Sequence, residues 1–392
     1  MSEAVETQAV GEAALRRSPL EESHGRAGAL LREQDGCVVV ASYGDVSAEY
    51  EAVRGGAGAG LFDLSSRGRV EVSGGEAVQF LNGMVTNDVA RLEEGAWMHA
   101  AFPNPQGRLV ASVRVFRTGG AFLFDTESAT TERMLKTLER FTLAGDFRVR
   151  DVTGETALLS LQGERAVEIV RDALGETAAD VPRGRAVAAG FQNGEVTVAR
   201  ATHTAEDGFD LFVSAADAVG LWNALVAARA RPAGFDALEI LRVEAGVPRY
   251  GVDASDANVV LEVVNEAEAV SYTKGCYAGQ EIIARIHWRG HVAKKLTGLI
   301  FARETETATD ARVRSCEESG REVGRITSTV FSPRLRRQVA LGLIKHDHLA
   351  PGTEVKIFDG ETEVCGAHVA ELPLVRGSWY AGRDEGAEET GG

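Results

Sequence analysis

The chain has 392 residues, 44% of them hydrophobic and 26% charged, which is the composition of a globular protein with two or three domains. Its 42 basic and 58 acidic residues give a formal net charge of −16, which argues against general binding to nucleic acid or to an anionic membrane. The four cysteines (Cys37, Cys276, Cys316 and Cys365) form no C-x-x-C pair and fit free thiols in a reducing compartment. An acidic N-terminus without an apolar run predicts a cytoplasmic protein.

Two stretches of the chain share one order of predicted elements, which is strand, helix, strand, strand, helix. The first has strands at 69–72, 109–116 and 121–125 and helical faces over 77–84 and 134–141. The second has strands at 157–161, 195–201 and 209–213 and helices over 166–174 and 219–226. The repeated order predicts two related α+β modules.

A short alignment supports the repeat. Laying V-E-V-S-G-G-E-A-V-Q-F-L (70–81) over L-S-L-Q-G-E-R-A-V-E-I-V (159–170) pairs two glycines, two alanines and two valines. The paired residues are Gly74 with Gly163, Ala77 with Ala166 and Val78 with Val167. Coincidence among common elements is the alternative interpretation.

The last third of the chain changes character. A helix is predicted from Asp236, where Asp236-x-x-Glu239 resembles a capping box. Strands then follow at 296–301, 322–331, 338–344, 353–358 and 364–371, which predicts a small all-β, barrel-like domain. The acidic end of the chain is predicted to be disordered.

The stretch T-K-G-C-Y-A-G-Q-E (273–281) places a cysteine between two glycines and before a predicted helix over 280–288. Gly275 and Gly279 allow backbone angles that other residues avoid, so the chain can turn sharply here. The helix N-terminus and Lys274 would favour a thiolate at Cys276, the form that attacks electrophiles. A small buried residue in a tight turn is the alternative.

The residues after this turn are basic, unlike the rest of the chain. They include Arg285, Arg289, Lys294 and Lys295, and they predict an anionic ligand with several carboxylates. A solvated helix face is the alternative. Two histidines follow at 287 and 291, but Gly290 is expected to end the helix between them, so no metal site is predicted.

K-G-C-Y-A-G-Q-E (274–281) closely resembles the signature of YgfZ-type proteins, which are folate-dependent factors for iron–sulfur clusters. Their larger superfamily is typified by the aminomethyltransferase, or T-protein, of glycine cleavage. Four further stretches resemble that superfamily: G-L-F-D-L-S-S-R-G-R-V-E-V-S-G (60–74), M-V-T-N-D-V (84–89), E-D-G-F-D-L-F-V (206–213) and L-R-V-E-A-G-V-P-R-Y-G-V-D (241–253).

The resemblance implies an α+β fold in which two folate-binding modules and a β-barrel form a cloverleaf around a central channel. The expected boundaries are an N-terminal extension (1–41), a first module (42–154), a second module that carries the cysteine motif (155–293), the barrel (294–376) and a disordered acidic tail (377–392).

The resemblance also assigns site residues. Glu206 is implied to accept two hydrogen bonds from the pterin ring of folate, although His203-Thr204-Ala205 replaces the family's Tyr-Thr-Gly before it. Arg242, Glu244 and Tyr250 are implied to line the folate channel. The alternatives are an exposed turn acid at 206 and an ordinary helical charge pair at 242 and 244.

Asp88 matches the aspartate that assists one-carbon transfer in the aminomethyltransferases, and a turn residue is its alternative role. Against a transferase, aminomethyltransferases typically carry a K-G-D-type sequence where this chain has Lys274-Gly275-Cys276.

Three hypotheses follow from these observations. The first is a tetrahydrofolate-binding YgfZ-type protein that supports iron–sulfur enzymes, with Cys276 and Lys274 as reactive residues and with iron–sulfur proteins or their assembly machinery as partners. The second is a folate-dependent aminomethyltransferase or other one-carbon transferase. The third is a scaffold that binds no folate. Neither nucleic acid nor membrane is an expected partner.

Overall fold

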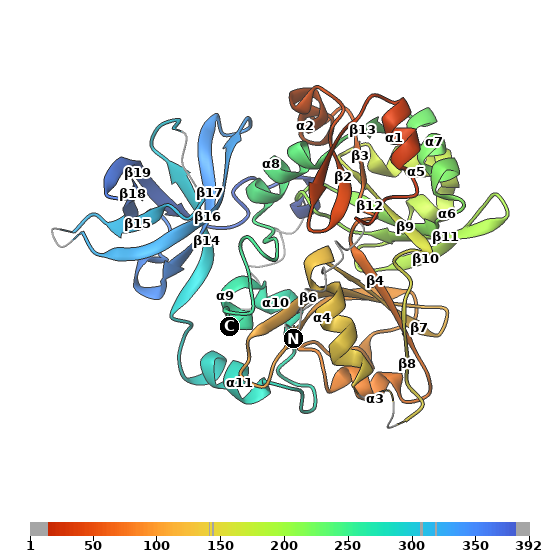
Figure 1. Cartoon of the computed structure of the whole chain (residues 1–392), viewed down its shortest axis with the longest axis horizontal. Coiled ribbons are helices and arrows are strands. Elements are labelled where there is room, and N and C mark those ends of the chain that lie inside the picture. The colour runs from red at the N-terminus through yellow and green to blue at the C-terminus, as the bar shows by residue number, and fades with distance from the viewer. Residues whose placement is uncertain (1–14, 141, 143–144, 306–308, 318–319, 382–392) are drawn as a thin grey trace, which may run out of the picture.

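The computed structural model describes residues 15–381 except 141, 143–144, 306–308 and 318–319. Figure 1 shows three lobes, with the barrel on the left, the first module at the lower right and the second module above it. Helix α8 lies between the barrel and the second module. The predicted α+β fold with a C-terminal barrel is confirmed. Among the described residues, no helix is both long enough and apolar enough to cross a membrane.

The first module is built on a five-stranded sheet with the order β5-β6-β7-β4-β8. Its elements are β4 (Gly68–Ser73), α3 (Ala77–Asn82), η1 (Val89–Arg91), β5 (Ala96–Pro103), β6 (Leu109–Thr118), β7 (Ala121–Thr126), α4 (Ser128–Glu139) and β8 (Arg148–Asp151). Leu81 of α3 and Met134 of α4 are fully buried against Val70 and Val113 of the sheet. Phe141, predicted for the last helical face, lies outside the described residues.

The second module repeats this plan. Its elements are β9 (Thr156–Gln162), α5 (Ala166–Leu174), α6 (Glu176–Ala179), β10 (Ala186–Phe191), β11 (Gly194–Arg200), β12 (Gly208–Ser214) and α7 (Ala218–Ala227). The strand order β10-β11-β12-β9 matches β5-β6-β7-β4 of the first module. The aligned glycines also share one role, because Gly74 (φ +117°) and Gly163 (φ +135°) both adopt backbone angles that favour glycine. The predicted repeat is therefore confirmed.

Strand β3 (Gly60–Asp63), which follows α2 (Val46–Arg54), belongs to the second module's sheet although it precedes the sheet of the first module in the chain. It lies within the residues expected for the first module, yet it pairs with β9 and with β13 (Arg231–Pro232) of the second. The elements before α2 are α1 (Glu21–Arg26), β1 (Leu30–Gln34) and β2 (Cys37–Ser42).

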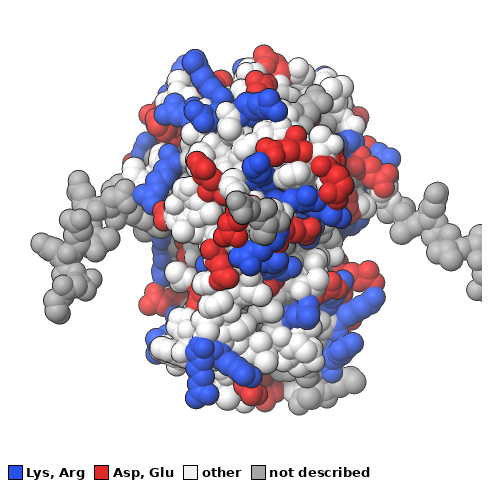
Figure 2. Space-filling model, turned by 90° about the vertical axis from the view of Figure 1, so that its left-hand side faces the viewer, with Lys and Arg blue, Asp and Glu red and all other residues white. Residues whose placement is uncertain are grey.

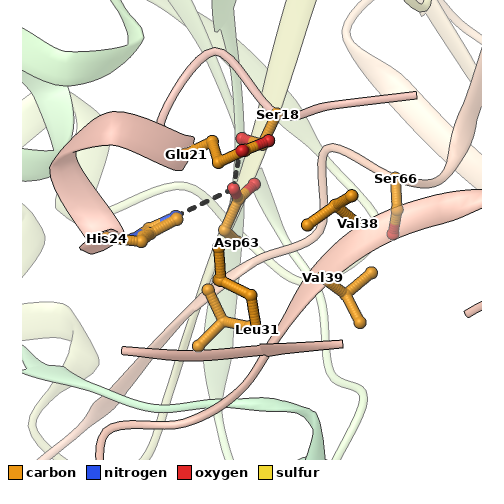
Figure 3. Close-up of a pocket in the computed structure, with 9 residues that line it drawn as sticks. Ser18, Glu21, His24, Leu31, Val38, Val39, Asp63 and Ser66 are labelled. Carbon is orange, nitrogen blue, oxygen red and sulfur yellow. Dashed lines mark hydrogen bonds and ion pairs between the residues drawn. The ribbon is translucent and has the colours of Figure 1, made fainter. Parts of the chain in front are cut away.

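A buried polar network anchors this N-terminal region to β3, and it borders the small pocket in Figure 3. His24 Nε2 lies 3.0 Å from Asp63 Oδ2, and the Tyr43 hydroxyl lies 2.7 Å from His24 Nδ1. Burial raises the pKa of the Asp63 carboxyl, but the hydrogen bond and charge of His24, together with hydrogen bonds from Ser18 and Ser65, outweigh it and leave that pKa below its usual value. We interpret the network as structural, because hydrogen bonds to its own neighbours satisfy it.

Short helices connect the second module to the barrel. They are α8 (Phe235–Ala245), α9 (Val260–Val263), α10 (Glu266–Ala269) and α11 (Gln280–Arg289), and α8 and α11 match the predicted helices. The predicted capping box at the start of α8 is wrong, because its N-cap is Gly234 and no side chain caps it. Asp236 instead pairs with Arg32, and Glu239 pairs with Arg242.

The barrel is a closed sheet with the order β14-β17-β16-β15-β18-β19. Its elements are β14 (Lys294–Phe301), β15 (Arg312–Ser315), β16 (Glu322–Ser332), β17 (Arg337–Lys345), η2 (His346–His348), β18 (Glu354–Asp359) and β19 (Thr362–Ala370). The expected disordered tail from 377 starts too early, because η3 (Ser378–Tyr380) is ordered and Trp379 is buried at 7% exposure. Residues 382–392 lie outside the described part of the chain.

Candidate functional site

A cavity lies where the N-terminal hairpin, both modules and α8 meet. Its volume is about 80 Å³, and it is partly open to solvent. Apolar side chains of α8 (Phe235 and Leu238) and of the N-terminal region (Val39 and Leu64) form part of its wall. The remaining lining is mostly polar or charged: Gln34, Asp35, Ser66, Arg67, Glu127, Ser128, His203, Glu239, Arg242 and Arg249, with Val247 and Pro248. Such a mixture of apolar walls and a few polar groups is typical of organic-ligand sites.

Several ionisable groups of the cavity wall have perturbed pKa values, Glu127 and His203 among them. Glu127, at the start of α4, lies 3.6 Å from Arg67. Burial raises the pKa of the Glu127 carboxyl, and Arg67 offsets only part of that shift. Burial likewise lowers the pKa of His203, whose Nε2 lies 3.0 Å from Asp210 Oδ2. A carboxyl with a raised pKa in a cavity is a candidate for proton transfer.

Arg242 also faces this cavity, but its guanidinium is already engaged. It donates to Asp253 Oδ2 at 2.6 Å and to Ser328 Oγ at 2.7 Å, and it pairs with Glu239. Burial opposes the charged form, but Asp253 and Glu239 outweigh it and hold the pKa of Arg242 above its ordinary value. The structure therefore joins α8 to the barrel strand β16 through Arg242.

Glu206 and Glu244 do not line this cavity; they share Arg54, which comes from α2. Arg54 Nη1 donates to Glu206 Oε1 at 2.7 Å, while Nε and Nη2 donate to Glu244 Oε2 at 3.2 and 3.0 Å. Glu244 is fully buried and also accepts from the hydroxyls of Tyr50 and Ser332. Glu206 is 5% exposed, so it is not the exposed turn acid of the alternative interpretation.

The other oxygen of Glu206 is bonded to the end of the described chain. Ser378 donates to Glu206 Oε2 from its backbone N–H at 2.7 Å and from its hydroxyl at 2.6 Å. The carboxylate that the sequence assigns to a pterin ring is thus held by Arg54 on one side and by Ser378 on the other. Tyr250, the last residue of the assigned set, accepts a hydrogen bond at 2.7 Å from Arg133 of α4.

The cysteine turn is held against the segment 84–89 of the first module. Lys274 Nζ donates to the carbonyl oxygens of Val85 at 2.7 Å and Asn87 at 2.6 Å. Burial lowers the pKa of Lys274 to about 8, and the neighbouring Asp88 carboxylate offsets part of that shift. The two motifs M-V-T-N-D-V and K-G-C-Y-A-G-Q-E therefore meet through Lys274.

Cys276 is exposed, so the alternative of a buried cysteine in a tight turn is wrong. None of the described residues makes a hydrogen bond to its sulfur, and the Lys274 ammonium contacts carbonyl oxygens instead. Gly279 (φ +76°) is the N-cap of α11, and a Cβ there would lie 2.4 Å from the Asn104 carbonyl oxygen. Gly275 has no such restriction, so only Gly279 must be glycine.

Asp88 has a local structural role. Its Oδ1 accepts a hydrogen bond from Ala90 N–H at 3.1 Å, which caps η1, and its Oδ2 lies 3.3 Å from Arg91. Asp88 does not line the cavity described above. The structure thus groups Asp88 with Lys274 at the cysteine turn, whereas Arg242 belongs to the cavity.

The basic stretch is only partly a surface patch. Lys274 is buried, whereas Arg285, Arg289 and Lys295 are exposed. Figure 2 views the molecule from the barrel side and shows basic and acidic side chains interspersed over this face. The two histidines near the end of α11 lie apart: His287 bonds Glu266, and the His291 ring stacks on His346 at 3.5 Å.

Comparison with known proteins decides the family. Residues 20–268 match the GCVT N-terminal domain, and residues 294–375 match the glycine cleavage T-protein C-terminal barrel domain. The chain belongs to the glycine cleavage T-protein family. It is 35% identical over 369 residues to the aminomethyltransferase of Rubrobacter xylanophilus, covering 94% of this chain and 96% of that protein. It is 31% identical over 370 residues to the aminomethyltransferase of Geobacillus kaustophilus, covering 92% of this chain and 99% of that protein.

A solved structure supports the fold of this T-protein family member. The aminomethyltransferase T of the Bartonella henselae glycine cleavage system superposes with a TM-score of 0.82 at 24% identity, over 92% of this chain and 98% of that one. The family matches and these relatives confirm the T-protein superfamily expected from the sequence. The match to the barrel domain ends at residue 375, just before the segment that bonds Glu206.

Three residues of this family member's site escaped the sequence reasoning, namely Arg54, Arg67 and Glu127. Arg54 precedes the first stretch that resembles the family, and Arg67 lies inside that stretch without a distinguishing feature. Glu127 precedes a helix with no distinctive motif. Their importance comes from contacts with residues far away in the chain, so no local pattern would have found them.

Proposed function

We propose that this protein is a folate-dependent one-carbon transferase that binds tetrahydrofolate in the cavity between the modules. The observation that carries the proposal is the cavity itself, which combines apolar walls with Arg67, Glu127 and His203 in a chain of the aminomethyltransferase family. Its lining fits the group: Phe235 and Leu238 offer apolar surface to a flat ring, and the charged residues offer partners for ring nitrogens and carboxylates.

The chain's own residues would bind the folate and transfer a proton. Tetrahydrofolate, when bound, supplies the nitrogen atoms that accept the one-carbon group. Glu127, with its raised pKa, would hold a proton or release it to a reacting nitrogen. Arg67 would keep that carboxyl oriented, and the apolar wall of α8 would exclude water. Glu206 lies outside the cavity lining, three residues after the cavity residue His203, and is the proposed acceptor for a pterin edge that reaches beyond the cavity, with Glu244 and Arg54 behind it.

The test uses the purified full chain, tetrahydrofolate and an aminomethylated carrier protein, with formation of methylenetetrahydrofolate as the readout. Glu127→Gln should lower the rate about 10²-fold or more, because general acid–base catalysis typically contributes about 10²–10⁴-fold. Glu132→Gln is the matched control: it makes the same change on the same helix, at a side chain that is 81% exposed. Equal rates in the two variants would contradict the role of Glu127.

The exposed Cys276 favours a second candidate function, the YgfZ-type role in maintaining iron–sulfur enzymes. Its thiol is accessible within K-G-C-Y-A-G-Q-E, and Lys274 holds the turn that presents it. Cys276→Ser should then abolish rescue of iron–sulfur enzyme activity in a host that lacks its own homologue, while Cys316→Ser, at another exposed cysteine, should not. Folate binding without turnover, together with this loss of rescue, would select the second function over the first.

A further inference from the structure

The segment Gly377–Tyr380, here called the C-terminal strap, covers the open side of the Glu206 carboxylate. Both of its donors reach one oxygen, since the Ser378 N–H and hydroxyl lie 2.7 and 2.6 Å from Oε2. The strap also leaves no room at the second oxygen: a Cβ at Gly377 would lie 2.4 Å from Oε1 and 2.5 Å from the Ala205 carbonyl oxygen. With Arg54 behind it, Glu206 has no free face for a ligand.

Further contacts hold the strap in place. Trp379 N–H donates to the Ala205 carbonyl oxygen at 3.1 Å, and Asp207 N–H donates to Ser378 Oγ at 2.9 Å. Arg183 donates to the Ser378 carbonyl oxygen at 3.1 Å, and its guanidinium lies 4.6 Å from the Trp379 ring centroid. The strap is therefore docked through its backbone and one aromatic side chain.

The strap donates two hydrogen bonds to Glu206 Oε2 and Arg54 donates to Oε1, so both oxygens that a ring with adjacent N–H groups would need are already engaged. A pterin edge presents that pair of donors, so the strap and such a ligand need the same acceptor. We propose that the C-terminal strap is an internal competitor that must leave Glu206 before a ligand with paired N–H donors binds there. This inference rests on the proposed function, because it concerns how folate reaches its carboxylate.

Competition of this kind lowers the apparent affinity by the fraction of molecules in which the strap is open. The strap follows the last residue of the matched barrel domain, residue 375, and is only four residues long. A ligand that displaces it would free the Ser378 and Trp379 amides. Binding would then increase, rather than decrease, hydrogen exchange in this segment.

The test measures tetrahydrofolate affinity by titration calorimetry on full-length variants. Gly377→Val drives a side chain into Glu206 Oε1, yet the backbone (φ −106°, ψ −170°) suits valine, so the strap should be expelled without change to the carboxylate. We expect affinity at least tenfold tighter than wild type. Gly154→Val is the matched control, since a Cβ there meets nothing within 4 Å, and its affinity should stay unchanged.

Two further variants guard against a folding artefact and locate the effect. Ser378→Ala removes one donor without steric change and should tighten binding by a smaller factor. Adding Glu206→Gln to Gly377→Val should abolish the gain, because the freed acceptor is the one that the ligand uses.

The outcomes separate the two proposals. Equal affinity of wild type, Gly377→Val and Ser378→Ala, or slower hydrogen exchange of the strap on binding, would overturn the strap proposal and leave folate binding intact. Absence of binding in wild type and in every strap variant would overturn both proposals.

Discussion

Replacing Arg54 by Met removes the cation that two buried carboxylates share. The Arg54 side chain is 3% exposed and donates one hydrogen bond to Glu206 and two to Glu244. Methionine fills most of the volume but leaves both carboxylates without their ionic partner. Removing one partner of a buried pair typically costs about 3–5 kcal/mol, and we expect a loss of that size in the free energy of unfolding.

Urea unfolding of the full chain measures this loss as a lower midpoint at an unchanged slope. Arg26→Met is the control, because Arg26 and Glu22 form an exposed pair (71% and 82%), and such pairs contribute about 0–1 kcal/mol. Glu244→Gln should lower the free energy of unfolding less in the Arg54→Met background than in wild type. In that background the Glu244 carboxylate has already lost its cation, and a neutral amide needs none. Equal losses for Arg54→Met and Arg26→Met would refute the reasoning.

Three other predictions follow from single residues. Burial sets the pKa of Lys274 to about 8, against about 10.4 in the unfolded chain, so its contribution to stability is fully present above pH 10.4 and lost as the pH falls through 8. Between pH 8 and pH 10, the stability of wild type should therefore rise relative to that of Lys274→Met, by at most about 3 kcal/mol, as followed in thermal melts. A stability difference that stays constant over this pH range would contradict the prediction. Gly279→Ala should cost about 2–3 kcal/mol through its positive φ and its contact with the Asn104 carbonyl oxygen, whereas Gly154→Ala should be nearly neutral in the same unfolding assay. Alkylation of the native protein should modify the exposed Cys276 before the buried Cys37, as read by mass spectrometry; the reverse order would contradict the exposure described.

Local periodicity was enough to predict most of the fold. Five of the six barrel strands, all but β15, and the amphipathic helices α4, α5 and α11 follow directly from the spacing of their apolar residues. Several strands were missed, and among them β5 and β10 have alanine-rich sequences with weak strand preference. They form only because neighbouring strands supply hydrogen bonds and a buried face.

The site was less predictable for a different reason. The resemblance identified Glu206, Glu244 and Arg242, but what each of them contacts depends on partners far away in sequence. Glu206 bonds Ser378, 172 residues away, and Arg54, 152 residues away. No pattern in the segments around Arg54 or Ser378 encodes those contacts. The sequence could therefore point to the Glu206 carboxylate but not show that Arg54 and Ser378 already hold it.

The crossing strand β3 has a consequence for the order in which the chain folds during synthesis. The first module's sheet uses only residues 68–151 and can form as soon as that stretch has left the ribosome. β3, made earlier, must wait about a hundred residues for β9 and longer still for Arg231–Pro232. Until then its apolar Leu61 and Phe62, both buried in the final structure, are without their partners. This early segment is thus among the last to be completed, and while it waits its apolar side chains are open to misassembly or chaperone capture.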